Sequence, residues 1–168
     1  MPYRIFIIIK SQGGIMTILT TSEIMALIPN RYPIIYIDRV EALEPDKKIV
    51  ATKLLTINES FMRGYQPDQP QMPNTLIIEA LAQTASILIL KSPAYAGKTA
   101  YLGAAKQVDF GRKARPGDQL QLTVTLIKTK SNMGVVQTSA TVDGENVCTA
   151  ELTFVVGPRD SQLEKNRG

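Results

Sequence analysis

Residues 74–90 read NTLIIEALAQTASILIL, and they follow directly on the loop 61–73, which reads FMRGYQPDQPQMP. Three prolines at three-residue spacing exclude both helix and central strand from this loop, and the last of them, Pro73, suits the first turn of a helix. A helix over 74–90 would be about 26 Å long and apolar on nearly every side. The stretch therefore predicts a helix that is buried within its fold.

Strand-like runs flank this helix on both sides. A short helix is expected to begin at a cap provided by Thr21 or Ser22 and to end before Pro29. The predicted strands are residues 34–41, 48–57, 99–110, 119–130, 134–142 and 146–156. Asp143-Gly144 is the strongest hairpin signal in the chain. One long apolar helix among six strands predicts an α+β domain, a curved antiparallel sheet wrapped around one long central helix, which is the plan of the hot-dog fold.

The length of 168 residues fits one domain. We expect an N-terminal extension over 1–20, the hot-dog domain over 21–157 and a polar tail over 158–168. The apolar run at 5–9 is shorter than a signal-peptide core or a membrane span, and Met16 is the expected natural start. The cytoplasm is then the expected location.

The composition excludes several kinds of site. The chain has no histidine and a single cysteine, Cys148, so Ser-His-Asp catalysis, histidine-bound zinc and cysteine-rich metal sites are ruled out. Cys148 itself reads as a core residue, and we expect no cofactor and no metal. The net charge of +4 is scattered, without interleaved aromatic residues, so an acidic protein fits as a partner as well as a nucleic acid or better.

Glu79 is the only ionisable residue within 74–90. In one interpretation it lies on a solvent-facing stripe with Gln83, one helical turn later. In the other it is a carboxyl in an apolar cleft that acts as a general acid. The free N–H groups of Asn74 and Thr75, at the start of the helix, are suited to polarising a carbonyl nearby. Together these features indicate a site where the loop meets the helix.

Four motifs resemble those of FabZ-type β-hydroxyacyl-acyl carrier protein dehydratases. Residues 29–40, PNRYPIIYIDRV, are similar to the family's P-H-R-[YF]-P-F-L-L-V-D-R-V, and 56–59, TINE, to the end of its V-T-x-N-E. Residues 64–83, GYQPDQPQMPNTLIIEALAQ, follow G-H-F-P-x-x-P-[VI]-[MF]-P-G-V-L-I-L-E-A-[LM]-A-Q. Phe110 with Pro116-Gly117-Asp118 is similar to F-x-x-P-V-x-P-G-D. The resemblance covers residues 23–156 and supports the hot-dog fold.

The resemblance implies a catalytic pair in which one half is altered. In this family a histidine removes the proton next to the thioester, and a glutamate from the other subunit protonates the departing hydroxyl. Glu79 matches the glutamate, whereas Tyr65 stands at the histidine position. Asn30 also stands where the family usually has histidine. The substrate-binding positions implied by the resemblance are Gly64, Gln66, Pro73, Asn74, Thr75 and Gln83.

These departures set the functional expectation. A phenol with an ordinary pKa of about 10 is a poor base at neutral pH, so we expect 3-hydroxyacyl dehydration to be lost or much reduced, with Tyr65 lining or plugging the old acyl tunnel. The alternative is a non-catalytic paralogue that binds acyl chains or acyl carrier protein, or that partners a complete dehydratase. A third reading is a hot-dog acyl thioesterase. The expected partners are acyl carrier protein or an acyl thioester, in a homodimer, a trimer of dimers or a hetero-oligomer.

Overall fold

The computed structural model describes residues 17–62 and 68–159. In chain order the elements are α1 (Thr21–Leu27), β1 (Arg39–Glu44), β2 (Lys48–Leu54), the 3-10 helix η1 (Ser60–Met62), α2 (Asn74–Leu90), the 3-10 helix η2 (Pro93–Tyr95), β3 (Lys98–Phe110), β4 (Gln119–Lys130), β5 (Met133–Val142) and β6 (Glu145–Pro158). The predicted helix over 74–90 is confirmed at both ends.

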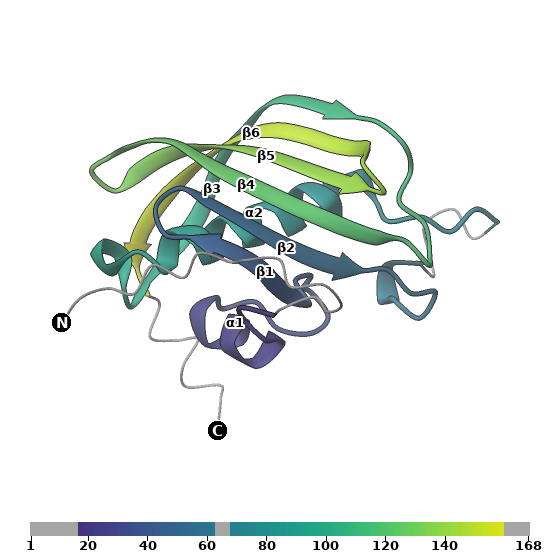
Figure 1. Ribbon diagram of the computed structural model, residues 1–168, viewed down its shortest axis with the longest axis horizontal. Helices are drawn as coiled ribbons and strands as arrows, with labels where there is room; N and C mark the ends of the chain where they lie inside the picture. The colour runs from purple at the N-terminus through teal and green to yellow at the C-terminus, as the bar shows by residue number, and fades with distance from the viewer. Residues whose placement is uncertain (1–16, 63–67, 160–168) are drawn as a thin grey trace, which may run out of the picture.

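The six strands form one antiparallel sheet in the order β1-β2-β4-β5-β6-β3. Figure 1 shows this sheet curving over α2, with α1 lying below β1. The predicted α+β hot-dog architecture is therefore confirmed. The sheet leaves β1 and β3 as its two edges.

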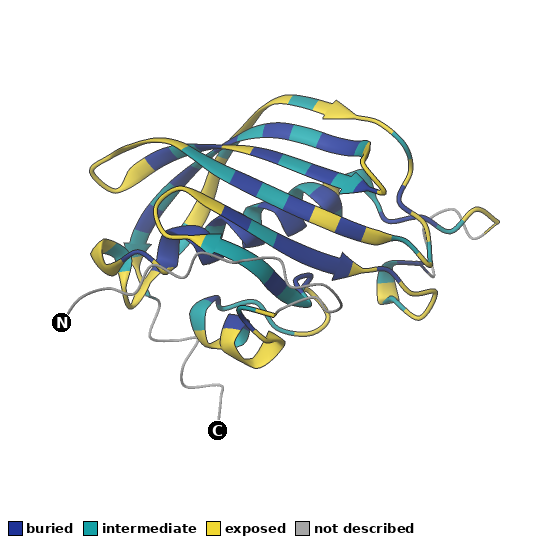
Figure 2. Cartoon of the chain, viewed as in Figure 1, coloured by how far each residue is buried: buried dark blue, intermediate teal, exposed yellow. Residues whose placement is uncertain are grey.

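Alternation along the strands explains why the sheet curves around α2. In β5 every second residue from Gly134 to Val142 is buried, and the intervening ones are exposed or partly exposed (Figure 2). Successive strand residues point to opposite faces, so this pattern puts one face of the sheet on the core. On that face Leu120, Leu122 and Val124 of β4 have no exposed surface. The apolar side chains of α2 fill the concave side against them.

The predicted hairpin between β5 and β6 is also confirmed. Asp143 and Gly144 have φ values of 50° and 82°, and Val142 pairs with Glu145 on either side of them. Two consecutive residues with positive φ produce the turn whose twist matches that of adjacent strands. Gly144 meets this requirement without strain because it has no Cβ.

The predicted cap of α1 was wrong by one residue. The N-cap is Thr20, whose Oγ1 accepts from the Glu23 N–H at 3.4 Å while the Glu23 carboxylate accepts from the Thr20 N–H at 2.8 Å. This reciprocal capping box requires a glutamate three residues after the cap, and only Thr20 has one. Thr21, one of the two predicted caps, instead donates its hydroxyl hydrogen to the Asp38 carbonyl at 2.6 Å. The bonds that the Glu23 carboxylate accepts from the Thr20 N–H and from the Thr20 hydroxyl lower the pKa of Glu23.

The predicted strand over 34–41 was wrong for residues 34–38, since β1 begins only at Arg39. Two polar groups of the backbone before it are satisfied by a side chain from α2. The Tyr36 N–H donates to Gln83 Oε1 at 2.9 Å, and the Ile34 carbonyl accepts from Gln83 Nε2 at 2.8 Å. With these groups already paired, the segment lies against the helix and not in the sheet.

Candidate active site

Glu79 lies on the second turn of α2 and is partly exposed. Its Oε1 accepts from Gln83 Nε2 at 2.8 Å and from Asn30 Nδ2 at 3.3 Å. The two donors come from different elements, because Gln83 is one turn further along the helix and Asn30 belongs to the segment after α1. The sequence-predicted carboxyl is therefore held by two amides, at the boundary between the core and its surroundings.

Gln83 does not lie on a solvent-facing stripe, so that interpretation of the Glu79 and Gln83 spacing was wrong. Only 2% of the Gln83 surface is exposed. The amide oxygen takes the Tyr36 N–H, and the amide nitrogen serves both Ile34 and Glu79. Burying an amide is tolerable when its polar atoms are paired, and here they are.

The start of α2 is held from outside the helix. Pro73 occupies the N-cap and provides no side-chain cap. Just before it, the Met72 N–H donates to the Ala114 carbonyl at 2.9 Å. Among residues 17–62 and 68–159 no acceptor meets the N–H of Asn74 or of Thr75. The two predicted N–H groups are thus unused by the described part of the fold.

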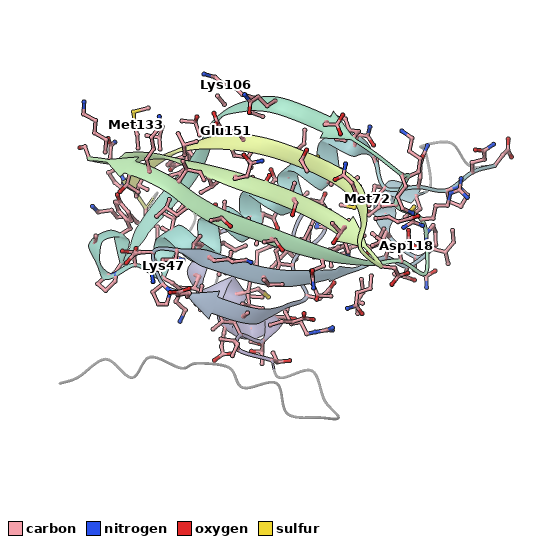
Figure 3. All side chains as sticks on the ribbon, turned by 45° about the horizontal axis from the view of Figure 1, so that its top comes forward. Lys47, Met72, Lys106, Asp118, Met133 and Glu151 are labelled. Carbon is pink, nitrogen blue, oxygen red and sulfur yellow. The ribbon has the colours of Figure 1, made fainter. Side chains whose placement is uncertain are left out.

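The connection between β3 and β4 supplies the brace for this helix start. Arg112 binds the Asp118 carboxylate through two nitrogens, at 3.1 and 3.3 Å, and Asp118 also accepts from the Arg115 N–H at 2.8 Å. The Gly117 N–H donates to the Leu55 carbonyl at 2.9 Å, which ties this connection to the end of β2. In Figure 3 Met72 and Asp118 lie together at one end of the sheet, with Lys47 and Met133 at the other.

A largely buried ion pair near Tyr36 was not predicted as a site feature. Lys53 of β2 forms an ion pair with Glu59, and their side chains are 5% and 21% exposed. The strand pattern contained a signal, because Lys53 continues the buried alternation of Ile49 and Ala51. The local pattern could not identify the partner of Lys53, because Glu59 lies beyond the end of the strand.

The phenol of Tyr36 lies close enough to both Glu59 and Glu79 to be affected by their charges. The residue is 4% exposed, and its ring packs edge-on against Phe61 with 6.0 Å between the ring centroids. Burial raises the pKa of the Tyr36 phenol, and the negative charges of Glu79 and Glu59 raise it further. The phenol of Tyr36 therefore stays protonated at neutral pH.

The described residues offer no metal site and no membrane span. No cluster of three or more histidine, cysteine, aspartate or glutamate side chains occurs within 17–62 and 68–159 that could hold a metal ion. None of the helices in that part of the chain has the length and hydropathy needed to cross a bilayer. Gly64, Tyr65 and Gln66 lie outside the described residues.

Comparison with known proteins identifies the family. A model described as a FabA-like domain matches residues 28–151. A Pediococcus pentosaceus protein named 3-hydroxyacyl-[acyl-carrier-protein] dehydratase FabZ is 60% identical over 147 residues, which are 88% of this chain and 99% of that protein. The chain belongs to the FabZ family. A FabZ from Lactiplantibacillus plantarum is 58% identical over 147 residues, covering 88% of this chain and all (100%) of that protein.

Solved structures agree with the fold of this FabZ protein. The dehydratase heterocomplex ApeI:P from Xenorhabdus doucetiae has a chain that superimposes with a TM-score of 0.70 at 14% identity, covering 86% of this chain and 97% of that chain. A hypothetical thioesterase with coenzyme A from Streptococcus pneumoniae gives a TM-score of 0.57 at 15% identity, with coverages of 82% and 93%. At these identities the likeness establishes the hot-dog fold alone.

Proposed function

We propose that this FabZ protein binds 3-hydroxyacyl chains carried by acyl carrier protein, and that its homodimer dehydrates them slowly or not at all. The observation that carries the proposal is a positioned carboxyl without a matching base. Glu79 is held by Asn30 and Gln83, whereas the chain has no histidine and has Tyr65 at the family's base position. Membership of the FabZ family supports the substrate class.

The chemistry explains why the missing histidine matters. Dehydration breaks the Cα–H bond and the Cβ–O bond, forms the Cα=Cβ double bond and releases water. A base takes the Cα proton, and an acid gives a proton to the departing hydroxyl. An imidazole with a pKa of about 6.5 can take that proton at neutral pH, whereas a phenol with a pKa of about 10 is almost entirely protonated. Glu79 supplies the acid half only.

A second subunit is proposed to cover the β3 edge. One side of β3 pairs with β6, and no strand from the described residues pairs with the other side. Large apolar side chains are exposed on this edge strand: Tyr101 at 49%, Leu102 at 46% and Phe110 at 38%. An open apolar edge favours pairing with another chain. If the second chain is another copy of this protein, the result is the proposed homodimer, and we propose that three such dimers can associate into a trimer of dimers. If the second chain is a histidine-bearing FabZ, the result is the proposed hetero-oligomer. The proposed location of these assemblies is the cytoplasm.

The decisive assay measures dehydration of a 3-hydroxyacyl thioester by the parent protein, Tyr65→His and Glu79→Gln. We expect the parent to be slower than Tyr65→His by about 100-fold or more, the usual contribution of a positioned base. Parent activity equal to that of Tyr65→His, and lost in Glu79→Gln, would overturn the proposal. Steady release of free thiol from acyl thioesters would favour the thioesterase instead.

The subunit proposal has its own test. Leu102→Lys places a charge on the β3 edge, and Ile127→Lys is the matched control, because Ile127 is 56% exposed on β4, away from that edge. Light scattering should show that Leu102→Lys lowers the mass of the assembly while Ile127→Lys leaves it unchanged. Equal masses for both variants and the parent would exclude β3 as the interface. Mixing the parent with a histidine-bearing FabZ whose own glutamate is changed to glutamine tests the hetero-oligomer, and dehydration by that mixture is expected.

A further inference from the structure

One oxygen of Glu79 receives both side-chain bonds. Gln83 Nε2 and Asn30 Nδ2 lie 2.8 and 3.3 Å from Oε1. No donor among residues 17–62 and 68–159 bonds to Oε2. Within the described part of the chain, the two oxygens of this carboxyl therefore have different surroundings.

The orientation of the Gln83 amide is fixed by the backbone and not by Glu79. The Tyr36 N–H needs an acceptor and finds Gln83 Oε1, while the Ile34 carbonyl needs a donor and finds Gln83 Nε2. A flipped amide would set donor against donor and acceptor against acceptor. Nε2 must therefore face Glu79.

The position of Asn30 is fixed as well. The guanidinium of Arg31 donates to the Asn30 carbonyl at 2.7 Å and to the Ile28 carbonyl at 2.9 Å. It also donates to the Met25 carbonyl at 2.8 Å, on the last turn of α1. These bonds hold the backbone on both sides of the Asn30 side chain, so its amide approaches Glu79 from a defined direction.

We infer that Asn30 is a positioning residue which, together with Gln83, makes Oε2 the proton-carrying oxygen of Glu79. Amide nitrogens donate and do not accept, so the oxygen that faces two of them cannot also carry the carboxyl hydrogen. In the protonated acid the hydrogen is therefore on Oε2. It passes from Oε2 to the departing β-hydroxyl as the Cβ–O bond breaks, which releases water and leaves the carboxylate. The proton that the base took from Cα restores the acid.

This inference rests on the proposed function, and its first test uses kinetics. In the Tyr65→His background, Asn30→Ala should lower kcat about tenfold, the usual scale for one hydrogen bond to a charged group, with KM within about twofold. Asn30→His, which returns an N–H donor, should recover most of the loss. Gln137→Ala is the matched control, because it removes an exposed amide on β5 that makes no contact with Glu79. Unchanged kcat in Asn30→Ala, or an equal loss in Asn30→His, would overturn the inference.

A second test does not depend on activity. In the ¹⁵N-labelled protein, Glu79→Gln should displace the side-chain amide resonances of Asn30 and Gln83 and leave that of Gln137 in place. An unmoved Asn30 resonance would overturn the inference even if the enzyme is active. Absence of dehydration in Tyr65→His would refute the proposed function instead, and the spectra would still decide whether Asn30 binds Glu79.

Discussion

The ion pair between Lys53 and Glu59 provides the sharpest test of the energetics behind the site. Lys53→Met keeps the length of the side chain and removes its charge. The side chains of this pair are 5% and 21% exposed, whereas those of a second pair, Lys47 and Glu44, are 71% and 58% exposed. Lys47→Met is therefore a matched control in which the same substitution is made at a solvent-exposed ion pair.

The difference in burial sets the expected magnitudes. Removing one partner of a fully buried pair costs about 3–5 kcal/mol, because the other charge is left without compensation. The carboxylate of Glu59 keeps about one fifth of its exposure, so solvent screens part of that cost and we expect about 2–3 kcal/mol. For Lys47→Met we expect almost no change in the free energy of unfolding, since exposed pairs contribute little.

Urea unfolding at one fixed protein concentration is the assay, because assembly of subunits would make stability concentration-dependent. With a slope of about 2 kcal/mol per molar urea, the midpoint of Lys53→Met should fall by about 1–1.5 M at unchanged slope. Adding Glu59→Gln should recover part of the loss by removing the uncompensated charge. A Lys53→Met midpoint no lower than that of Lys47→Met would refute the reasoning.

Two further predictions concern close packing and the single thiol. Gly134→Ala would place a Cβ 2.3 Å from the Phe154 ring and should cost about 1–3 kcal/mol, whereas Gly103→Ala, with its nearest atom at 3.5 Å, should be nearly neutral in the same urea assay. Burial, with a smaller effect of Asp109, raises the pKa of the Cys148 thiol from 9.0 to about 11. Native protein should therefore resist alkylation at about pH 8. The stability that Cys148 contributes should be complete below about pH 9 and disappear as the pH rises through about 11, so parent and Cys148→Ala midpoints should converge in alkali.

Local pattern was sufficient to predict the framework of this fold. The helix over 74–90 follows a proline loop and is apolar on nearly every side, so both its start and its burial are determined locally. Asp143-Gly144 could likewise be recognised, because the turn depends on the backbone freedom of two adjacent residues. The strands β3 to β6 follow from alternation and were predicted to within two residues at each end.

The errors at residues 34–38 and at Gln83 occurred where a side chain from a distant part of the chain takes the place of a backbone partner. Gln83 is 47 and 49 residues from Tyr36 and Ile34, the two residues whose backbone it binds. A window of sequence around 34–41 begins with four consecutive apolar residues, and it gives no sign that backbone groups within it are already paired with a distant side chain. The same bonds explain why Gln83 is buried although its spacing from Glu79 also suited an exposed helix face.

Gln83 and Asn30 both bind Glu79, but only Gln83 also binds backbone groups that the fold must satisfy. Replacing Gln83 would leave the Tyr36 N–H and the Ile34 carbonyl without partners, at a cost of about 1–3 kcal/mol for each buried group, so folding alone is sufficient reason to keep it. The amide of Asn30 holds no backbone group and donates only to Glu79 among the described residues. Under the proposed function, Tyr65 leaves the chain without the base, while the fold still holds Glu79 through Gln83. The fold does not need the contact between Asn30 and Glu79. The kcat of Asn30→Ala is therefore a better measure than that of any Gln83 variant of whether Glu79 still acts as the acid.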